Sequence, residues 1–145
     1  MYSISKAGPA QYDELITIWE NSVRATHYFL KEEDIVLFKG LIMDQYFQLA
    51  NLYSAKDNEG IIVGFIGELD KNLEMLFINP LLQGKGIAGQ LIKFALNNLQ
   101  VTRVDVNEQN ANAKAFYEHF GFKIMSRSAL DGTGKPYPIL HMQLI

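Results

Sequence analysis

Residues 73–92 read Leu-Glu-Met-Leu-Phe-Ile-Asn-Pro-Leu-Leu-Gln-Gly-Lys-Gly-Ile-Ala-Gly-Gln-Leu-Ile, and this stretch decides the fold. It predicts a buried strand, a short loop rich in glycine, and then an amphipathic helix. Three glycines, Gly84, Gly86 and Gly89, stand where that helix begins. Glycine lets the backbone turn tightly and approach a ligand, and a helix N-terminus offers unpaired N–H groups with a partial positive charge. The stretch therefore predicts a site for a phosphate or pyrophosphate group.

Strands and helices are predicted on both sides of this loop from the spacing of apolar residues. Strands are expected at residues 2–7, 51–55, 61–69, 73–78, 101–106, 123–128 and 139–144. Helices are expected at residues 11–26, 87–98 and 111–119, and in a stretch after the acidic run 32–34. The apolar stripe of that last stretch comprises Ile35, Phe38, Leu41, Ile42 and Leu49. The order predicts one α/β domain over residues 1–145, a mixed sheet of about six or seven strands with helices on both faces.

Composition excludes several classes of protein. The chain has 145 residues and a net charge of −3 without a block of like charges, which argues against a basic nucleic-acid interface. Its apolar runs are too short to span a bilayer, and no signal peptide is recognisable. It has no cysteine, which excludes disulfides, thiolate metal sites and a cysteine nucleophile. No His, Asp and Glu spacing predicts a metal site, and we expect a cytoplasmic location.

A dinucleotide cofactor is the first alternative to consider for the glycine loop. Residues 84–89 match G-x-G-x-x-G, and Asp105 lies near the spacing of the acid that binds ribose. However, a dinucleotide domain carries this motif after its first strand, whereas three or four strands precede it here. Asp105 is also expected in the middle of a strand and not at its carboxyl end. A nicotinamide dinucleotide is therefore disfavoured.

The loop resembles that of the GNAT family of N-acetyltransferases more closely. Gln83-Gly-Lys-Gly-Ile-Ala88 matches the family pattern Q/R-x-x-G-x-G/A. Residues 107–122, Asn-Glu-Gln-Asn-Ala-Asn-Ala-Lys-Ala-Phe-Tyr-Glu-His-Phe-Gly-Phe, resemble the second family signature, in the family order. Segments near both ends, including Ile18-Trp19 and residues 134–138, further resemble the YjaB-type bacterial members. The likeness covers essentially the whole chain and implies a GNAT-like sheet with a splayed pair of parallel strands.

The resemblance implies that acetyl-CoA is the cofactor and CoA the product. The strand before the loop would pair with the pantetheine arm, and the loop amides would hold the pyrophosphate. The implied cofactor-binding residues are Leu76, Phe77, Ile78, Gln83, Gly84, Lys85, Gly86, Ile87, Ala88, Gly89, Asn107, Asn112 and Tyr117. Two of these have simpler interpretations, because Lys85 could be a solvated loop lysine and Asn112 a residue that only starts a helix.

Tyr117 matches the family tyrosine that donates a proton to the departing thiolate, although it could also be simple aromatic packing beside Phe116. A base must also remove a proton from the amine. Some family members have a glutamate on the strand before the loop, and counting back from Gln83 without gaps places that position at Asn72, which cannot act as a base. Glu74 is the best candidate, because it is two residues further on and shares that face of the strand. Glu68 is the second candidate. His27 is expected to line the acceptor pocket and is a further candidate, whereas His119 and His141 are interpreted as surface or packing residues.

The sequence thus predicts an acyltransferase that moves an acetyl group from acetyl-CoA to a primary amine by direct attack in a ternary complex. The acceptor is expected to be a small molecule or a polypeptide, in a pocket that includes His27 and Tyr137. No nucleic acid, membrane or metal is expected, and the protein would be a monomer or a homodimer. A non-catalytic module that binds or senses acyl-CoA is the alternative.

Overall fold

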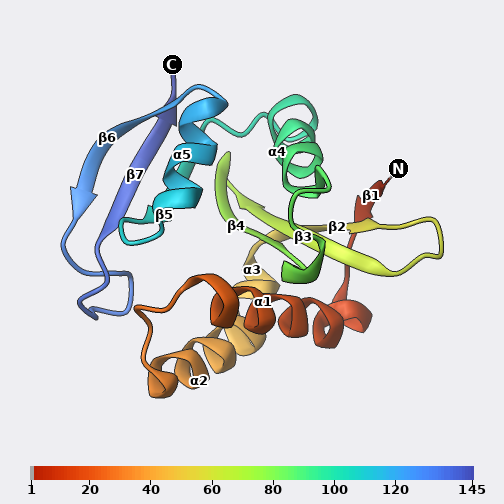
Figure 1. Cartoon of the computed structure of the whole chain (residues 1–145), viewed down its shortest axis with the longest axis horizontal. Coiled ribbons are helices and arrows are strands. Elements are labelled where there is room, and N and C mark those ends of the chain that lie inside the picture. Colours follow the sequence, from red (N-terminus) through yellow and green to blue (C-terminus); the bar gives the residue numbers. More distant parts are fainter. Residues whose placement is uncertain (1) are drawn as a thin grey trace.

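A mixed β-sheet runs through residues 2–145, the part of the chain that the computed structural model describes. Within these residues seven strands lie in the order β1-β2-β3-β4-β5-β7-β6 (Figure 1). β4 and β5 are parallel, and the other neighbours are antiparallel. The strands are β1 (Ser3–Lys6), β2 (Asn51–Lys56), β3 (Ile62–Leu69), β4 (Asn72–Ile78), β5 (Arg103–Asn107), β6 (Phe122–Ser128) and β7 (Ile139–Leu144).

Helices cover both faces of this sheet (Figure 1). One face carries α1 (Tyr12–Thr26), α2 (Glu32–Leu41) and the short α3 (Phe47–Leu49). The other carries α4 (Ile87–Asn98) and α5 (Ala111–His119). The predicted fold class, a mixed sheet with helices on both faces, is confirmed, and the predicted bounds of α4 and α5 agree with the structure.

β3 is the strand most completely buried between the two layers. Its residues from Ile62 to Glu68 are all buried, because helices pack on both faces of the sheet. Phe65 packs in the core beneath α1 and α2, and the next residue, Ile66, packs in the core beneath α4. Burying each such side chain contributes about 1.5–3 kcal/mol. The continuous apolar run in the sequence therefore reflects two cores that share one strand.

β4 and β5 separate almost as soon as they meet. Two residue pairs join them, Asn72 with Arg103 and Leu73 with Val104. Beyond these pairs β4 continues along β3 as far as Ile78, and β5 continues along β7 as far as Asn107. The gap between the two strands is visible at the centre of Figure 1. The splayed parallel pair that the family resemblance implied is therefore present.

A β-bulge interrupts β4 at Glu74. Met75 pairs with Gly67 and Leu73 pairs with Glu68, so Glu74 is left without a partner on β3. Residues two apart share one face of a regular strand. Leu73 nevertheless packs in the core beneath α4, and Met75 packs in the core beneath α1. The bulge therefore changes which face of the sheet the side chains after it point to, and it lies at Glu74, the residue that the sequence predicted as the base.

The helical stretch after the acidic run departs from the predicted pattern. The sequence placed Leu49 on the buried stripe, but Leu49 is 65% exposed and Phe47 is 1% exposed. A π-helical turn (Ile42–Tyr46) separates α2 from α3, and the Phe47 N–H donates to the Ile42 carbonyl five residues earlier. This turn holds one residue more than an α-helical turn, so the residues after it are rotated and Phe47 takes the buried position.

No helix formed by residues 2–145 is long and apolar enough to span a lipid bilayer.

Because the π-helical turn buries Phe47 and exposes Leu49, we expect alanine substitutions at these two residues to have unequal effects on stability. Phe47→Ala should lower the free energy of unfolding by about 3–5 kcal/mol, because it leaves a cavity in the core. Leu49→Ala should change it by less than about 1 kcal/mol, because Leu49 is on the surface. Denaturant unfolding of both variants measures this. A larger loss in Leu49→Ala would contradict the rotated register.

Candidate active site

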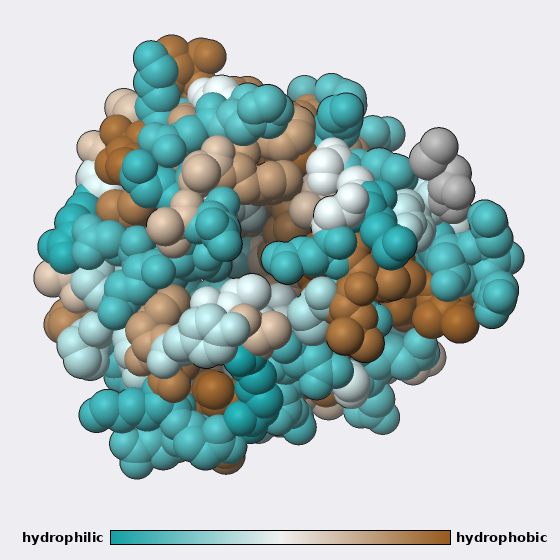
Figure 2. Space-filling view, viewed as in Figure 1, coloured by the Kyte–Doolittle hydropathy of each residue, from teal (hydrophilic) through white to brown (hydrophobic). Residues whose placement is uncertain are grey.

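The gap between β4 and β5 opens into a cleft of about 680 Å³. Figure 2 shows the surface hollowed at this place. Both strands, the start of α4 and one side of α5 form its walls. Twelve of the residues predicted to bind the cofactor line it: Leu76, Phe77, Ile78, Gln83, Gly84, Gly86, Ile87, Ala88, Gly89, Asn107, Asn112 and Tyr117. The exposed side chain of Lys85 does not line it in the described structure.

The glycine loop leaves open space before the N-terminus of α4. Gly84 and Gly86 have φ values of +81° and +82°, a backbone conformation that favours glycine. An added Cβ on Gly84, Gly86 or Gly89 would meet no heavy atom within 4 Å. Gly86 is the N-cap residue and has no side chain with which to cap this end. The first N–H groups of a 12-residue helix therefore remain available to an anion.

Tyr117 projects from α5 toward the same cleft. Its ring packs edge-on against Phe116 and Phe122, with centroids 5.2 and 5.8 Å away. The side chain is buried, and this burial raises the pKa of its phenol. The hydroxyl therefore keeps its proton at neutral pH and can act as a donor within the cleft.

The three asparagines near the start of α5 have different roles. Asn110 is the N-cap residue, and its side chain accepts a hydrogen bond from the Ala113 N–H at 3.2 Å. Asn112 is the second residue of the helix and is exposed along the cleft. The simpler interpretation of Asn112 as the helix-start residue therefore applies to Asn110 instead. Asn107 ends β5 and also lines the cleft.

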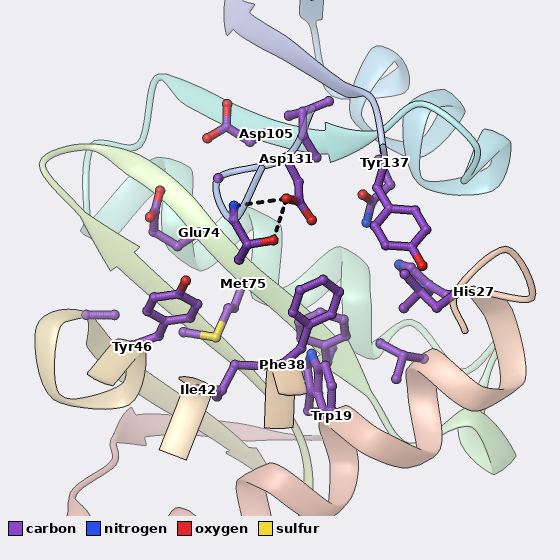
Figure 3. A pocket seen from close by; sticks show the side chains of 18 of the residues that line it. Trp19, His27, Phe38, Ile42, Tyr46, Glu74, Met75, Asp105, Asp131 and Tyr137 are labelled. Atoms are coloured by element: carbon purple, nitrogen blue, oxygen red, sulfur yellow. Dashed lines mark hydrogen bonds between the residues drawn. The ribbon is translucent and has the colours of Figure 1, made fainter. Parts of the chain in front are cut away.

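A second cavity, of about 440 Å³, lies on the α1 and α2 side of the sheet. Figure 3 shows the aromatic side chains of Trp19, Phe38 and Tyr137 around it, with Glu74 and Asp105 on the strands. Asp131, from the loop before β7, is the third acidic residue in its wall. Among the described residues that line it there is no lysine or arginine. The cavity is thus apolar and aromatic with an acidic side.

The two cavities meet at the gap in the sheet. Their walls have six residues in common: His27, Glu74, Met75, Phe77, Asp105 and Asn107. Most of these come from β4 and β5, beyond the last residue pair that joins those strands. A molecule in the cleft can therefore contact a molecule in the second cavity through the sheet.

Glu74 stands at this junction with a perturbed carboxyl group. Desolvation raises the pKa of Glu74, and the nearby charge of Asp105 raises it further, while a hydrogen bond from the Asn72 amide acts in the opposite direction. A carboxylate with a raised pKa is a better proton acceptor than an ordinary one. Glu68, the second candidate base, lies outside the cavities and accepts bonds from the Asn51 amide and the Lys71 N–H, each 2.9 Å long.

His27 lies at the junction, but its imidazole is a poor base. The side chain is buried, and burial lowers its pKa to about 4. Its Nδ1 is 2.7 Å from the Thr26 hydroxyl, and its ring packs on Phe29. A neutral imidazole of this kind can shape the wall of a site or form a hydrogen bond within it. It binds a proton too weakly to remove one efficiently from an ammonium group.

Tyr137 contributes its ring to the second cavity, while its hydroxyl has a structural role. The hydroxyl donates to the Asp34 carboxylate and accepts from the Lys31 N–H. Lys135 Nζ also contacts Asp34, at 3.0 Å. These bonds fasten the loop before β7 to the start of α2, and so close one side of the cavity.

Sequence reasoning missed one connected group of side chains beside the junction. His141 Nδ1 is 2.7 Å from Asp105 Oδ1, and His141 Nε2 is 2.6 Å from Ser128 Oγ. His141 was interpreted as a surface or packing residue. The signal that would have found the group is the register of β5, β7 and β6, which the sequence does not contain. Residues 2–145 include no cluster of three or more His, Asp or Glu side chains that could hold a metal ion.

Comparison with known proteins gives one consistent result. A family model described as an acetyltransferase (GNAT) domain matches residues 31–136. The chain is 36% identical to a Salmonella typhimurium protein named peptidyl-lysine N-acetyltransferase YjaB, over 98% of this chain and 97% of that protein. The solution structure of apo YjaB from Escherichia coli superposes with a TM-score of 0.90 at 34% identity, covering 100% and 98% of the two chains. A Thermoplasma acidophilum PaiA N-acetyltransferase in complex with coenzyme A has the same fold, with a TM-score of 0.77 at 19% identity over 100% and 99%.

The hydroxyl of Tyr137 should contribute measurably to stability. Tyr137→Phe keeps the ring and removes a bond to a carboxylate, so the melting temperature should fall by roughly 2–5 °C. Tyr28→Phe is the matched control, because the Tyr28 side chain is 83% exposed. Calorimetry of both variants measures the difference, and equal melting temperatures would mean that the bond to Asp34 adds no stability.

Proposed function

Since the chain belongs to the GNAT family of acetyltransferases, we propose that it transfers the acetyl group of acetyl-CoA to the side-chain amine of a lysine in a peptide or protein. The observation that carries this proposal is the meeting of two cavities at the gap between β4 and β5. The cleft has features that suit an anionic, phosphorylated molecule, and the second cavity has features that suit a cation with an apolar stem.

The residues of the cleft fit CoA. The open space at Gly84, Gly86 and Gly89 leaves room for a diphosphate against the backbone of the helix N-terminus. Residues 76–78 would hold the pantetheine arm, since beyond Leu73 the β4 edge toward β5 has no strand partner among residues 2–145. When bound, acetyl-CoA would supply an activated acetyl group and a sulfur leaving group.

Proton transfer would be divided between the two sides of the junction. Glu74 would take one proton from the incoming ammonium group, so that the nitrogen gains a free electron pair for attack on the acetyl carbon. Tyr117 would donate its proton to the sulfur that leaves as a carbon–nitrogen bond replaces the carbon–sulfur bond. The nitrogen would give its second proton to the phenolate, and Glu74 would release its proton to solvent, so that both side chains return to their starting states. The chain has no cysteine to carry the acetyl group, so direct transfer is the expected route.

The charge of the second cavity favours a lysine acceptor. Trp19, Phe38 and Tyr46 can pack along the methylene groups of a lysine side chain, while Glu74 and Asp105 attract its ammonium group. The similarity to proteins named for peptidyl-lysine acetylation supports the same substrate class. The enzyme assignment of the family and the position of Tyr117 favour transfer over a purely sensory role.

Substitution at Gly89 tests the phosphate site. Gly89 is outside the left-handed φ region, so Gly89→Ala should fold normally while its methyl group occupies space beside the cleft. We expect the Kd for CoA to rise about tenfold or more, with little change for pantetheine, which lacks the diphosphate. Gly40→Ala is the control, because this exposed α2 glycine also has open space and lies outside both cavities.

Titration calorimetry with CoA, pantetheine and NAD measures these affinities. Equal weakening for CoA and pantetheine would contradict a role in binding the diphosphate. Saturable binding of NAD without binding of CoA would contradict the choice of cofactor.

Tyr117→Phe tests the catalytic part of the proposal. Turnover on a lysine peptide should fall about 10²–10⁴-fold, because the proton donor is lost while the ring remains. The Kd for CoA should change little, since the hydroxyl acts mainly in the transition state. Tyr53→Phe is the control, because Tyr53 packs on Phe94 and does not line either cavity.

Thiol release and mass spectrometry of the peptide together measure this transfer. Full turnover in Tyr117→Phe would remove this residue from the mechanism. CoA binding by the wild type without acetylation of any amine would favour the sensory module instead.

A further inference from the structure

A chain of three side chains runs from the junction of the cavities to the edge of the sheet. Asp105 and His141 are direct cross-strand partners on β5 and β7, and His141 also lies beside β6, which carries Ser128. The imidazole bridges the carboxylate and the hydroxyl, with bonds of 2.7 and 2.6 Å. His141 lies opposite Ser126 on β6, so Ser128, two residues further along that strand, reaches the imidazole as a diagonal neighbour.

Asp105 is the end of this chain that a substrate can reach. It lines the cleft and the second cavity together with Glu74, and its side chain is 43% exposed. His141 binds its Oδ1 atom, whereas Oδ2 has a weak contact with the Asn72 amide at 3.4 Å. One oxygen of this carboxylate is therefore held firmly, and the other is available to a ligand.

The third carboxylate of the second cavity, that of Asp131, does not line the cleft and so lies outside the junction. Asp131 Oδ1 accepts bonds from the Thr133 N–H, the Thr133 hydroxyl and the Lys135 N–H. These bonds shape the loop before β7. Glu74 and Asp105 therefore remain as the two acidic groups that can meet an amine at the junction.

We propose that Asp105 binds the ammonium form of the acceptor and sets the preference for a cationic amine, while His141 and Ser128 hold its carboxylate in position. The proposal rests on the proposed function and assigns different tasks to the two carboxylates. Glu74, which is partly desolvated and sits on the bulge of β4, removes the proton. Asp105, oriented by the imidazole, holds the charged nitrogen beside Glu74 until the proton leaves.

A purely structural role would have a different signature. A cross-strand pair of polar side chains commonly stabilises a sheet to a small degree. If Asp105 served only to stabilise the sheet, loss of its carboxylate would lower the melting temperature and leave the KM for every acceptor unchanged. The distinction therefore lies in the acceptor KM and in its dependence on the charge of the acceptor.

Steady-state kinetics of Asp105→Asn with a lysine peptide at one fixed pH tests the proposal. The KM for the peptide should rise about tenfold or more, with kcat within a few-fold of wild type, because a charge-assisted bond to the substrate is lost. Glu74→Gln should show the opposite split, a large fall in kcat with a small change in KM. Glu59→Gln removes the same charge from an exposed turn residue outside the cavities and should match wild type.

An uncharged acceptor separates charge recognition from general damage. Hydroxylamine is mainly neutral near pH 8, so Asp105→Asn should leave its KM nearly unchanged. An equal rise in KM for hydroxylamine and for the lysine peptide would overturn the proposal. So would an unchanged KM for the peptide in a variant that folds with normal CoA affinity.

Variants of His141 test the positioning role. His141→Leu removes the donor to Asp105 and should raise the KM for the peptide several-fold. His141→Asn can place an amide N–H near the position of Nδ1 and should restore most of the wild-type KM. Ser128→Ala should have the same direction of effect as His141→Leu, but smaller. Equal KM values for the leucine and asparagine variants would contradict this role.

The outcomes for the wild type distinguish this inference from the proposed function. If wild-type protein acetylates no amine, the proposed function fails and Asp105 has no acceptor to bind. If wild-type protein acetylates the lysine peptide but Asp105→Asn keeps the same KM, the inference about Asp105 alone fails.

Discussion

The early separation of β4 from β5 is the constraint on which the rest of the molecule depends. Parallel neighbours in a sheet normally stay paired along their length, because unpaired backbone groups are costly when buried. Here two residue pairs join the strands, and then each follows its outer neighbour. The separation opens a passage through the sheet and leaves a β4 edge that needs another partner. A ligand with amide groups along an extended arm, such as pantetheine, can supply it.

The passage joins two environments of opposite electrostatic character. On the α4 side, the glycine loop presents helix N–H groups without side-chain caps, which favour an anion. On the α1 and α2 side, aromatic rings and acidic groups line a cavity that contains no lysine or arginine among the described residues. This difference in charge between the two sides of the sheet would keep an anionic donor and a cationic acceptor apart until their reactive ends meet between the strands. The helices on the two faces also belong to separate cores, so each side has its own support.

Several departures from regular geometry lie around this passage. The bulge at Glu74 places both Glu74 and Met75 in the walls of the cavities, although adjacent residues of a regular strand face opposite ways. The π-helical turn buries Phe47 and leaves Tyr46 in the wall of the second cavity. Bonds from Tyr137 and Lys135 to Asp34 fasten the loop before β7 over the same cavity. The π-helical turn and the loop before β7 border the second cavity, whereas the bulge at Glu74 borders both cavities.

The sequence by itself determined the fold class, the order of the elements and most of the cleft. Local signals sufficed for these, since periodicity locates strands and helices, and glycines mark the start of α4. Gln83, Gly84 and Gly86 line the cleft together, because all three belong to one short loop of the chain. Tyr117 was located through a family signature on one short helix. The glycine-loop motif likewise placed Lys85 in this loop, and the role of Lys85 in binding the cofactor stays a prediction, since a motif gives the position of a residue but not the direction of its side chain.

Tertiary structure alone decided which distant residues meet. Asp105 contacts His141, and His141 contacts Ser128, because β7 inserts between β5 and β6 in a particular register. No local pattern encodes that register. The sequence pattern also did not show that Phe47 is buried or that Met75 points toward α1. One extra residue in a helical turn rotates the residues that follow it, and one extra residue in a strand moves the following side chains to the opposite face, whereas periodicity assumes an unbroken element. Local signals therefore fixed the elements and the side whose geometry favours an anion, and packing between elements decided the acidic side.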